Sequence, residues 1–165
     1  MTLLVGALTI GLILSLLALG VFISFRIFEF PDITADGSIT LGAAVASTLL
    51  VKGVSPALAT LAGFAAGMLA GMTTGVLHTK FKINGLLSGI LVMTALYSVN
   101  LHVMGKSNVP LLSESTVGTY AERAGALFLG STGDINLGGW LVSMRDISML
   151  LMAFAFVALI GLGLY

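Results

Sequence analysis

The chain contains no cysteine, and only 8% of its 165 residues are charged. The absence of cysteine excludes disulfides, thiolate catalysis and cysteine-based metal sites. Ordinary soluble domains carry about 25% charged residues, so the shortage of charge, together with a hydrophobic content of 58%, indicates an integral membrane protein. Acidic and basic residues balance at 7 each, so the net charge indicates no class of partner. No basic run or basic amphipathic helix is present, which disfavours peripheral membrane attachment, and we expect no nucleic-acid partner.

Several motifs that carry chemistry are also missing. There is no G-x-x-x-x-G-K-[ST], so the sequence predicts no P-loop and no bound nucleotide, and neither G-x-G-x-x-G nor H-E-x-x-H occurs. We interpret His78 and His102 as interfacial polar residues and expect neither a metal nor a cofactor. Ser88-Gly89 resembles part of an intramembrane serine-protease signature, but no later span supplies a histidine base. We therefore expect no enzyme, and interpret Ser88 as a helix-packing residue.

The hydrophobic runs predict an all-α, polytopic membrane helical bundle. Four runs are long enough to cross a bilayer, at residues 2–25, 57–77, 84–104 and 147–164. Residues 41–51 are apolar but short, and a break at residues 52–56 follows them, so we interpret them as a re-entrant or half helix; that they cross instead stays open. A polar segment covers residues 106–145, in which residues 120–129 could form a short amphipathic helix. We treat residues 1–165 as one transmembrane domain.

The basic turn at Lys80 and Lys82 sets the predicted orientation, because short cytoplasmic loops are enriched in Lys and Arg. Residues 30–38, here called the acidic segment, precede residues 41–51. If residues 41–51 are re-entrant, the acidic segment lies outside the cell, on the side opposite the Lys80–Lys82 turn. Arg26 disagrees, since it would then be external. If residues 41–51 cross, the acidic segment becomes cytoplasmic.

Four glycines predict a site of close helix packing. Gly63, Gly67, Gly71 and Gly75 recur every fourth residue and would form a stripe along one side of the second span. Small residues let helix backbones approach closely in lipid, where packing drives association. The alternative is the general enrichment of glycine in membrane helices.

The candidate substrate path consists of polar residues in two regions. Asp32, Thr34, Asp36 and Ser38 alternate in the segment between the first two apolar runs, and Thr94 and Ser98 share one face of the third full span. Asp36 or Ser38 would also cap a helix that starts near Ile39, whose free N–H groups could receive an anionic group. Thr94 and Ser98 could instead bond to neighbouring helices.

The energy source is expected to lie in another chain. The predicted spans contain no Asp, Glu, Lys or Arg, whereas ion-driven carriers usually place such groups near the membrane midplane. A structural or assembly subunit of a membrane complex explains the small residues and the missing chemistry equally well, but it gives no reason for the acidic segment.

Two sequence blocks resemble bacterial ABC-importer permeases. The blocks are residues 30–45, F-P-D-I-T-A-D-G-S-I-T-L-G-A-A-V, and residues 89–101, G-I-L-V-M-T-A-L-Y-S-V-N-L, followed by Met104-Gly105 and Asn108-Val109-Pro110-Leu111. The resemblance is to the group allied to branched-chain amino-acid importers, including a subgroup assigned to tryptophan/tyrosine-type uptake.

This resemblance implies a permease for a small solute such as an amino acid, in the cytoplasmic (inner) membrane of a bacterium. The implied partners are a separate ATP-binding subunit, an extracytoplasmic substrate-binding protein, a second permease subunit in a homo- or heterodimer, and membrane lipid. Such permeases are nearly twice as long, so the chain is expected to correspond to an N-terminal portion without a recognisable ATPase-docking loop.

Overall fold

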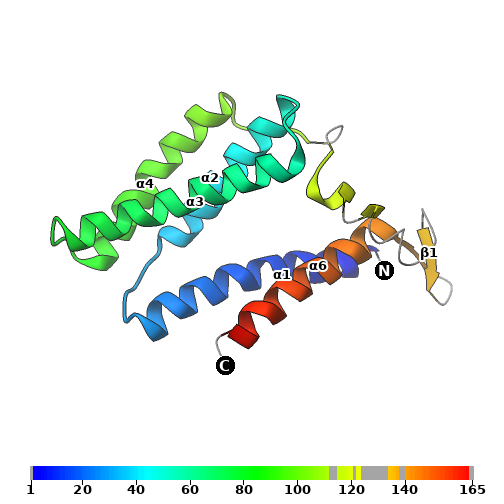
Figure 1. Cartoon of the computed structure of the whole chain (residues 1–165), viewed down its shortest axis with the longest axis horizontal. Coiled ribbons are helices and arrows are strands. Elements are labelled where there is room, and N and C mark those ends of the chain that lie inside the picture. Colours follow the sequence, from blue (N-terminus) through cyan, green and yellow to red (C-terminus); the bar gives the residue numbers. More distant parts are fainter. Residues whose placement is uncertain (1, 112–114, 121, 124–133, 138–139, 164–165) are drawn as a thin grey trace. The chain divides into compact units, whose positions relative to one another are not determined.

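The computed structural model describes residues 2–111, 115–120, 122–123, 134–137 and 140–163. Its regular elements are mostly helices, and a short π-helical turn, η1, continues the first of them (Figure 1). In chain order they are α1 (Thr2–Phe22), η1 (Ile23–Ile27), α2 (Thr34–Val51), α3 (Pro56–Thr79), α4 (Gly85–Met104), β1 (Asp134–Leu137), β2 (Trp140–Ser143) and α6 (Met144–Gly163). The amphipathic helix predicted at residues 120–129 lies mostly outside the described residues.

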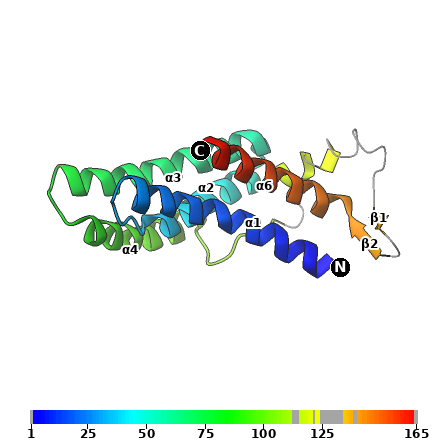
Figure 2. The same cartoon turned by 90° about the horizontal axis from the view of Figure 1, so that it is seen from below.

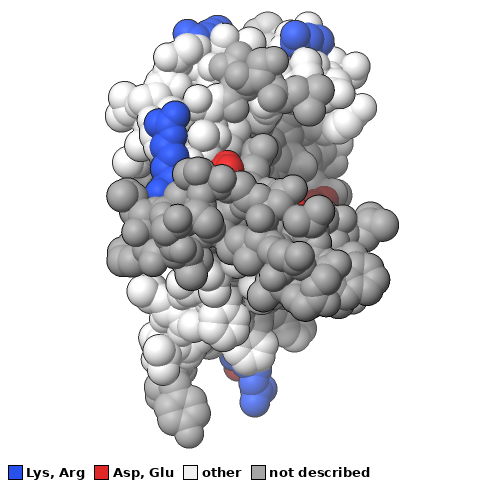
Figure 3. All heavy atoms as spheres, turned by 90° about the vertical axis from the view of Figure 1, so that its right-hand side faces the viewer, with Lys and Arg blue, Asp and Glu red and all other residues white. Residues whose placement is uncertain are grey.

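The predicted all-α membrane bundle is confirmed. Within the described residues, five helices are long and apolar enough to cross a membrane, and they include Thr34–Val51. Few charged side chains are visible on the face shown in Figure 3. The antiparallel pairing of β1 with β2 was not predicted. Its signal was present, because polar and apolar residues alternate in Asp134–Leu137 and Gly138-Gly139, a dipeptide favoured in hairpin turns, follows them.

The chain divides into two compact units, which we describe separately. One consists of residues 1–18 and 115–165 and contains α6 and most of α1, and the other consists of residues 19–114. The second unit, here called the α2–α4 bundle, contains α2, α3 and α4, which pack on one another (Figures 1 and 2). Its buried core combines Leu41 from α2, Ala70 from α3, and Val92 and Leu96 from α4.

The start of α2 differs from the sequence prediction. The helix begins at Thr34 rather than near Ile39, so Asp36 and Ser38 do not cap it. Asp32 Oδ1 accepts the Thr34 backbone N–H at 2.8 Å, which is the local bond that aspartate side chains favour at helix starts. Residues 34–40 are therefore the first two turns of an 18-residue helix about 27 Å long, enough to cross a bilayer core.

Local sequence signals explain the ends of α3 and α4. Pro56 stands in the first turn of α3, where a missing N–H costs nothing, and the Asn84 side chain accepts the Leu86 N–H at the start of α4. Gly105 ends α4 with φ of 64°, a left-handed conformation that glycine adopts without strain. These short connections make α2, α3 and α4 successive antiparallel neighbours in the chain.

Small residues bring α2 and α3 together. A β-carbon added at Gly63 would lie 2.6 Å from the backbone oxygen of Gly42, and one added at Gly67 would lie 3.4 Å from that of Ser38. Gly71 and Gly75 would meet nothing within 4 Å. The glycines do not form one straight stripe, because four residues turn an α-helix by about 400°, so each step drifts about 40° away from the contact. The buried positions Ala59, Gly63, Ala70 and Thr74 instead follow the helical repeat.

The ends of the bundle contradict the re-entrant arrangement of residues 41–51. Phe30, from the connection between α1 and α2, packs edge-on against His78 at the end of α3, with ring centroids 4.8 Å apart. A β-carbon at Gly85, the first residue of α4, would also meet the Phe30 ring. The acidic segment and the Lys80–Lys82 turn therefore lie at the same end, as expected if α2 crosses the bundle, and not on opposite sides.

Candidate functional site

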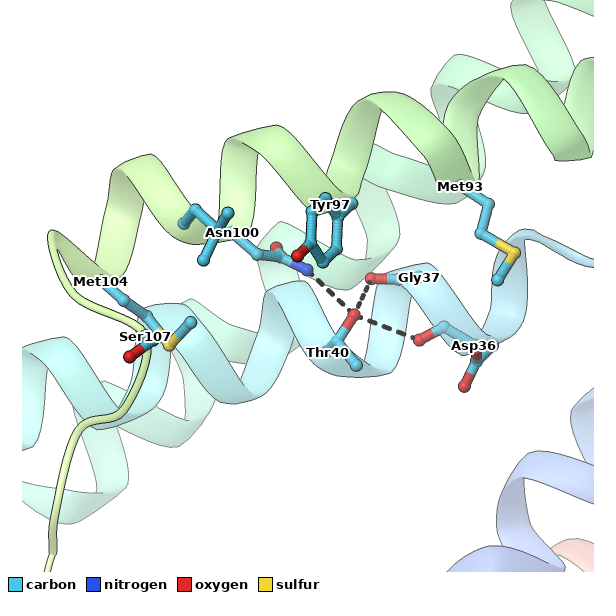
Figure 4. Close-up of a pocket in the computed structure, with 9 residues that line it drawn as sticks. Asp36, Gly37, Thr40, Met93, Tyr97, Asn100, Met104 and Ser107 are labelled. Carbon is cyan, nitrogen blue, oxygen red and sulfur yellow. Dashed lines mark hydrogen bonds between the residues drawn. The ribbon is translucent and has the colours of Figure 1, made fainter.

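A pocket of about 390 Å³ lies between α2 and α4; we call it the α2–α4 pocket. Its lining combines side chains of both helices and of the residues that follow α4 (Figure 4). The lining residues are Asp36, Gly37, Thr40, Met93, Tyr97, Asn100, Leu101, Met104 and Ser107. The two helices run parallel here, since Thr34 lies near Gly89 and Thr40 near Asn100.

A hydrogen-bonded pair joins the helices within the pocket. Asn100 Nδ2 donates to Thr40 Oγ1 at 2.9 Å, and the Thr40 hydroxyl donates to the Gly37 carbonyl at 2.8 Å (Figure 4). Asn100 is 8% exposed, and its Oδ1 atom is buried without a hydrogen-bond partner among the described residues. The wall of the pocket therefore contains an unsatisfied acceptor, which is itself almost completely covered.

Asp36 lies level with the middle of α4, and its side chain is exposed on the side of α2 that lines the pocket. A β-carbon at the adjacent Gly37 would be 3.3 Å from the Cα atom of Met93, and Met93 is close to the midpoint of α4. Eight residues separate Met93 from the start of α4, which corresponds to about 12 Å along the helix axis. An acidic side chain at that depth in a membrane bundle is rare, and where it occurs it usually marks a substrate or ion pathway.

The other predicted path residues in α2 have local partners. Asp32 bonds to the start of α2, Ser38 Oγ donates to the Ala35 carbonyl at 2.9 Å, and Thr34 is almost completely buried. The Thr34 and Thr74 hydroxyls form a hydrogen bond of 2.7 Å between α2 and α3. The structure thus brings only Asp36 of this set into the pocket. An anion bound at the start of α2, as predicted, would have to displace the Asp32 carboxylate, which already accepts the Thr34 N–H.

The predicted path residues on α4 lie away from the pocket. Thr94 and Ser98 are exposed, and neither lines the cavity. Thr94 Oγ1 donates to the Ile90 carbonyl of its own helix at 2.8 Å. The buried positions of α4 are Gly85, Ser88, Gly89, Val92, Leu96 and Asn100. Because Asn100 continues that buried series at helical spacing, helical periodicity was the signal that separated it from Thr94 and Ser98.

Comparison with known proteins assigns a family to this arrangement. A family model described as "Branched-chain amino acid transport system / permease component" matches residues 3–164. The chain belongs to this permease family. It is 55% identical over 109 residues to a tyrosine transport system permease protein of Clostridioides difficile (strain R20291), covering 66% of this chain and 37% of that protein.

A second relative extends over the whole chain. An uncharacterized protein of Rickettsia prowazekii (strain Madrid E) is 33% identical over 166 residues, covering 100% of this chain and 54% of the relative. The chain thus spans between about a third and a half of the curated relatives it matches. No solved structure matches it.

Another cavity of the permease, of about 530 Å³, lies near the start of α2, at the end of the bundle away from Lys52. Its lining includes Ile23, Phe28, Phe30 and His78, and it is mainly apolar. His78 Nδ1 lies 2.8 Å from the Ile83 carbonyl, so this ring nitrogen is already used to hold the turn between α3 and α4. This cavity offers fewer free polar groups to a solute than the α2–α4 pocket does.

The burial and the hydrogen bond of Ser88 in the permease fit a structural role in α4. Its side chain is fully buried, and Oγ donates to the Asn84 carbonyl at 3.0 Å. Serine and threonine hydroxyls commonly bond to the preceding turn of their own helix in this way. This geometry accounts for Ser88 without any nucleophilic role.

Proposed function

We propose that the chain forms part of the translocation path of an ABC importer in the cytoplasmic membrane of a bacterium. The proposed solute is an amino acid, and the tyrosine transport permease that shares 55% identity with the chain favours tyrosine. The path would run along the α2–α4 pocket. In this proposal, both units of the chain belong to a single permease domain.

One observation carries the proposal: a charged group and a free buried acceptor share a pocket near the middle of a membrane bundle. Asp36 supplies the charge, and Asn100 supplies the acceptor. A structural subunit would gain stability from apolar residues at these positions, because an unsatisfied buried acceptor is costly. A path for a polar solute needs such groups, since they replace the water that the solute loses.

The arrangement of basic residues supports an orientation for the path. Arg26, Lys80 and Lys82 belong to the connections at one end of the α2–α4 bundle, and Lys52 and Lys106 line a small cavity at the other. We propose that the first end is cytoplasmic, because Lys and Arg favour that side. This orientation also removes the disagreement over Arg26. The pocket then extends from the middle of the bundle, past Met104 and Ser107, toward the outside.

The proposed energy source is a separate ATP-binding subunit. ATP binding there would switch the bundle between outward- and inward-facing states, and an extracytoplasmic binding protein would deliver the solute to the outer end of the pocket. A second permease subunit, identical or related, would complete the pore. Membership of a transport-system permease family supports these partners.

Reconstitution tests the proposal. The permease is placed in liposomes with its ATPase and binding protein, and uptake of labelled tyrosine is followed with and without internal ATP. We expect accumulation against a gradient only with ATP and all components, and none with the permease alone. Uphill uptake by the permease alone, or no ATP-dependent uptake of any amino acid by the complete assembly, would contradict the proposal.

Thr94 and Ser98 stay predictions as path residues, and the same assay tests them. Thr94→Val and Ser98→Ala remove the hydroxyls while preserving most of the side-chain volume. If these residues face the solute in the complete transporter, each variant should raise the tyrosine concentration needed for half-maximal uptake. Unchanged uptake in both variants would remove them from the path.

A further inference from the structure

The free oxygen of Asn100 calls for an explanation of its own. More than nine-tenths of the side chain is buried, yet Oδ1 has no hydrogen-bond partner within the described chain. Buried polar atoms in native proteins nearly always have a partner, so an exception commonly marks a place that a ligand or water completes. Asn100 lines the α2–α4 pocket, and its Oδ1 atom is covered, so a molecule in that pocket supplies the partner once a small movement of the wall uncovers this atom.

The bonds of Thr40 decide which end of the amide is free. The Thr40 hydroxyl has one proton, which it donates to the Gly37 carbonyl at 2.8 Å, so its oxygen must accept from Asn100. If the amide were turned over, Thr40 would have to give up that bond, and two N–H donors would be left unpaired. The side chain is therefore held with Nδ2 toward Thr40 and an acceptor unsatisfied.

The charge of the pocket selects the kind of donor that fits this acceptor. Asp36 lines the same pocket one helical turn before Thr40, and none of the described lining residues is Lys, Arg or His. A carboxylate entering the pocket would meet a like charge and an acceptor oxygen. An ammonium group brings three N–H donors and a positive charge, which suits both groups. Met93, Leu101 and Met104 contribute apolar side chains to the same lining.

We propose that the α2–α4 pocket is a subsite for the ammonium group of the transported amino acid. Asn100 Oδ1 accepts one N–H of the ammonium group, and the Asp36 carboxylate balances its charge. Thr40 is a positioning residue, because it fixes the amide orientation. The proposal rests on the function proposed above and adds which end of the solute this half of the path recognises.

Thiol labelling tests the selectivity directly. The chain has no cysteine, so Ser107→Cys places a single reactive thiol in this chain, at the outer end of the pocket. The rate of labelling is measured on the purified permease–ATPase complex without the binding protein, whose own selectivity would otherwise intervene. The three probes are tyrosine, tyramine, which has the ammonium but no carboxylate, and 3-(4-hydroxyphenyl)propionate, which has the carboxylate but no ammonium.

We expect tyrosine and tyramine to slow labelling, and the deaminated acid to need at least about a tenfold higher concentration for the same protection, as for loss of a charge-assisted hydrogen bond. Equal protection by tyramine and the deaminated acid would overturn the proposal. So would protection by the deaminated acid alone.

Substitutions at Asn100 separate recognition from structure. Asn100→Leu should raise the half-protecting concentration of tyramine by about tenfold, whereas Asn100→Asp keeps an acceptor, adds negative charge and should bind tyramine at least as tightly as the parent. Val99→Ala, on the exposed side of α4, is the matched control and should change nothing. If Asn100→Asp weakens tyramine protection as much as Asn100→Leu does, Asn100 acts only through Thr40 and the proposal fails.

Asp36→Asn provides a second, independent variant, in case Asn100→Leu does not assemble. It preserves the shape of the side chain, removes the charge, and should reduce the preference for tyramine over the deaminated acid. An unchanged preference overturns the proposal. ATP-dependent tyrosine uptake by the parent transporter separates failure of the subsite proposal from failure of the proposed function. If uptake is intact but the three probes protect equally, only the ammonium subsite is rejected. If uptake is absent, the proposed function is rejected.

Discussion

Replacing Gly63 by alanine tests the packing of α2 on α3. The added β-carbon would lie 2.6 Å from the Gly42 backbone oxygen and 3.2 Å from the Ala46 side chain. An ordinary contact begins near 3.4 Å, so the two backbones must separate locally by about 0.8 Å. A rotamer change cannot relieve the clash, because the atom that is met belongs to the backbone.

The expected cost follows from two opposing effects. Alanine favours the helix over glycine by up to about 1 kcal/mol, and overpacking a well-packed contact costs about 1–3 kcal/mol. Gly71→Ala is the matched control, because a β-carbon there meets nothing within 4 Å in the same helix. The gain in helix propensity is common to both variants, so the difference of about 1–3 kcal/mol in free energy of unfolding isolates the contact.

The assay is reversible unfolding of the purified protein in one detergent, followed by circular dichroism for both variants and the parent. We expect Gly63→Ala to unfold at a lower denaturant concentration than Gly71→Ala. If Gly63→Ala is as stable as Gly71→Ala, the backbones do not meet at Gly63, and the helix register described above is wrong.

Two further predictions concern the bundle. A double-mutant cycle of Thr34→Val and Thr74→Val should give a coupling of about 1 kcal/mol in the free energy of unfolding, as for other interhelical hydrogen bonds in membranes, and additive effects would show that the 2.7 Å hydrogen bond contributes nothing. In intact cells, an impermeant thiol reagent added outside should label Lys52→Cys but neither Phe28→Cys nor Lys82→Cys. If only one of Phe28→Cys and Lys82→Cys is labelled, these two positions lie on different sides of the membrane, and the re-entrant arrangement of residues 41–51 is correct.

The sequence predicted the class of fold because hydrophobicity and length alone nearly determine which segments can cross a bilayer. The start of α2 was misplaced because a segment containing Asp32, Thr34 and Asp36 is compatible both with a polar loop and with a first helical turn. The choice depends on the Thr34–Thr74 hydrogen bond and on the close approach to Gly89 in α4. Those contacts are between segments far apart in the chain, so no local pattern reveals them.

The candidate site was predicted only in part. Asp36 was singled out by its charge among apolar residues, and it lines the α2–α4 pocket. Asn100 and Tyr97 were passed over in favour of Thr94 and Ser98, which share a polar face but do not line the pocket. The signal lay in α4 itself, because the small residues Gly85, Ser88 and Gly89 begin the buried series that Asn100 continues at helical spacing.

The most direct test of the central claim is to block the α2–α4 pocket chemically in the working transporter. Thr40→Cys places a thiol in the pocket, and Val99→Cys places one on the exposed side of α4. The complete transporter carrying each variant is treated with a bulky methanethiosulfonate reagent, and ATP-dependent tyrosine uptake is measured before and after. We expect uptake to stop in Thr40→Cys, with protection by excess tyrosine, and to persist in Val99→Cys. Full uptake by completely modified Thr40→Cys would contradict the claim that the solute passes through this pocket.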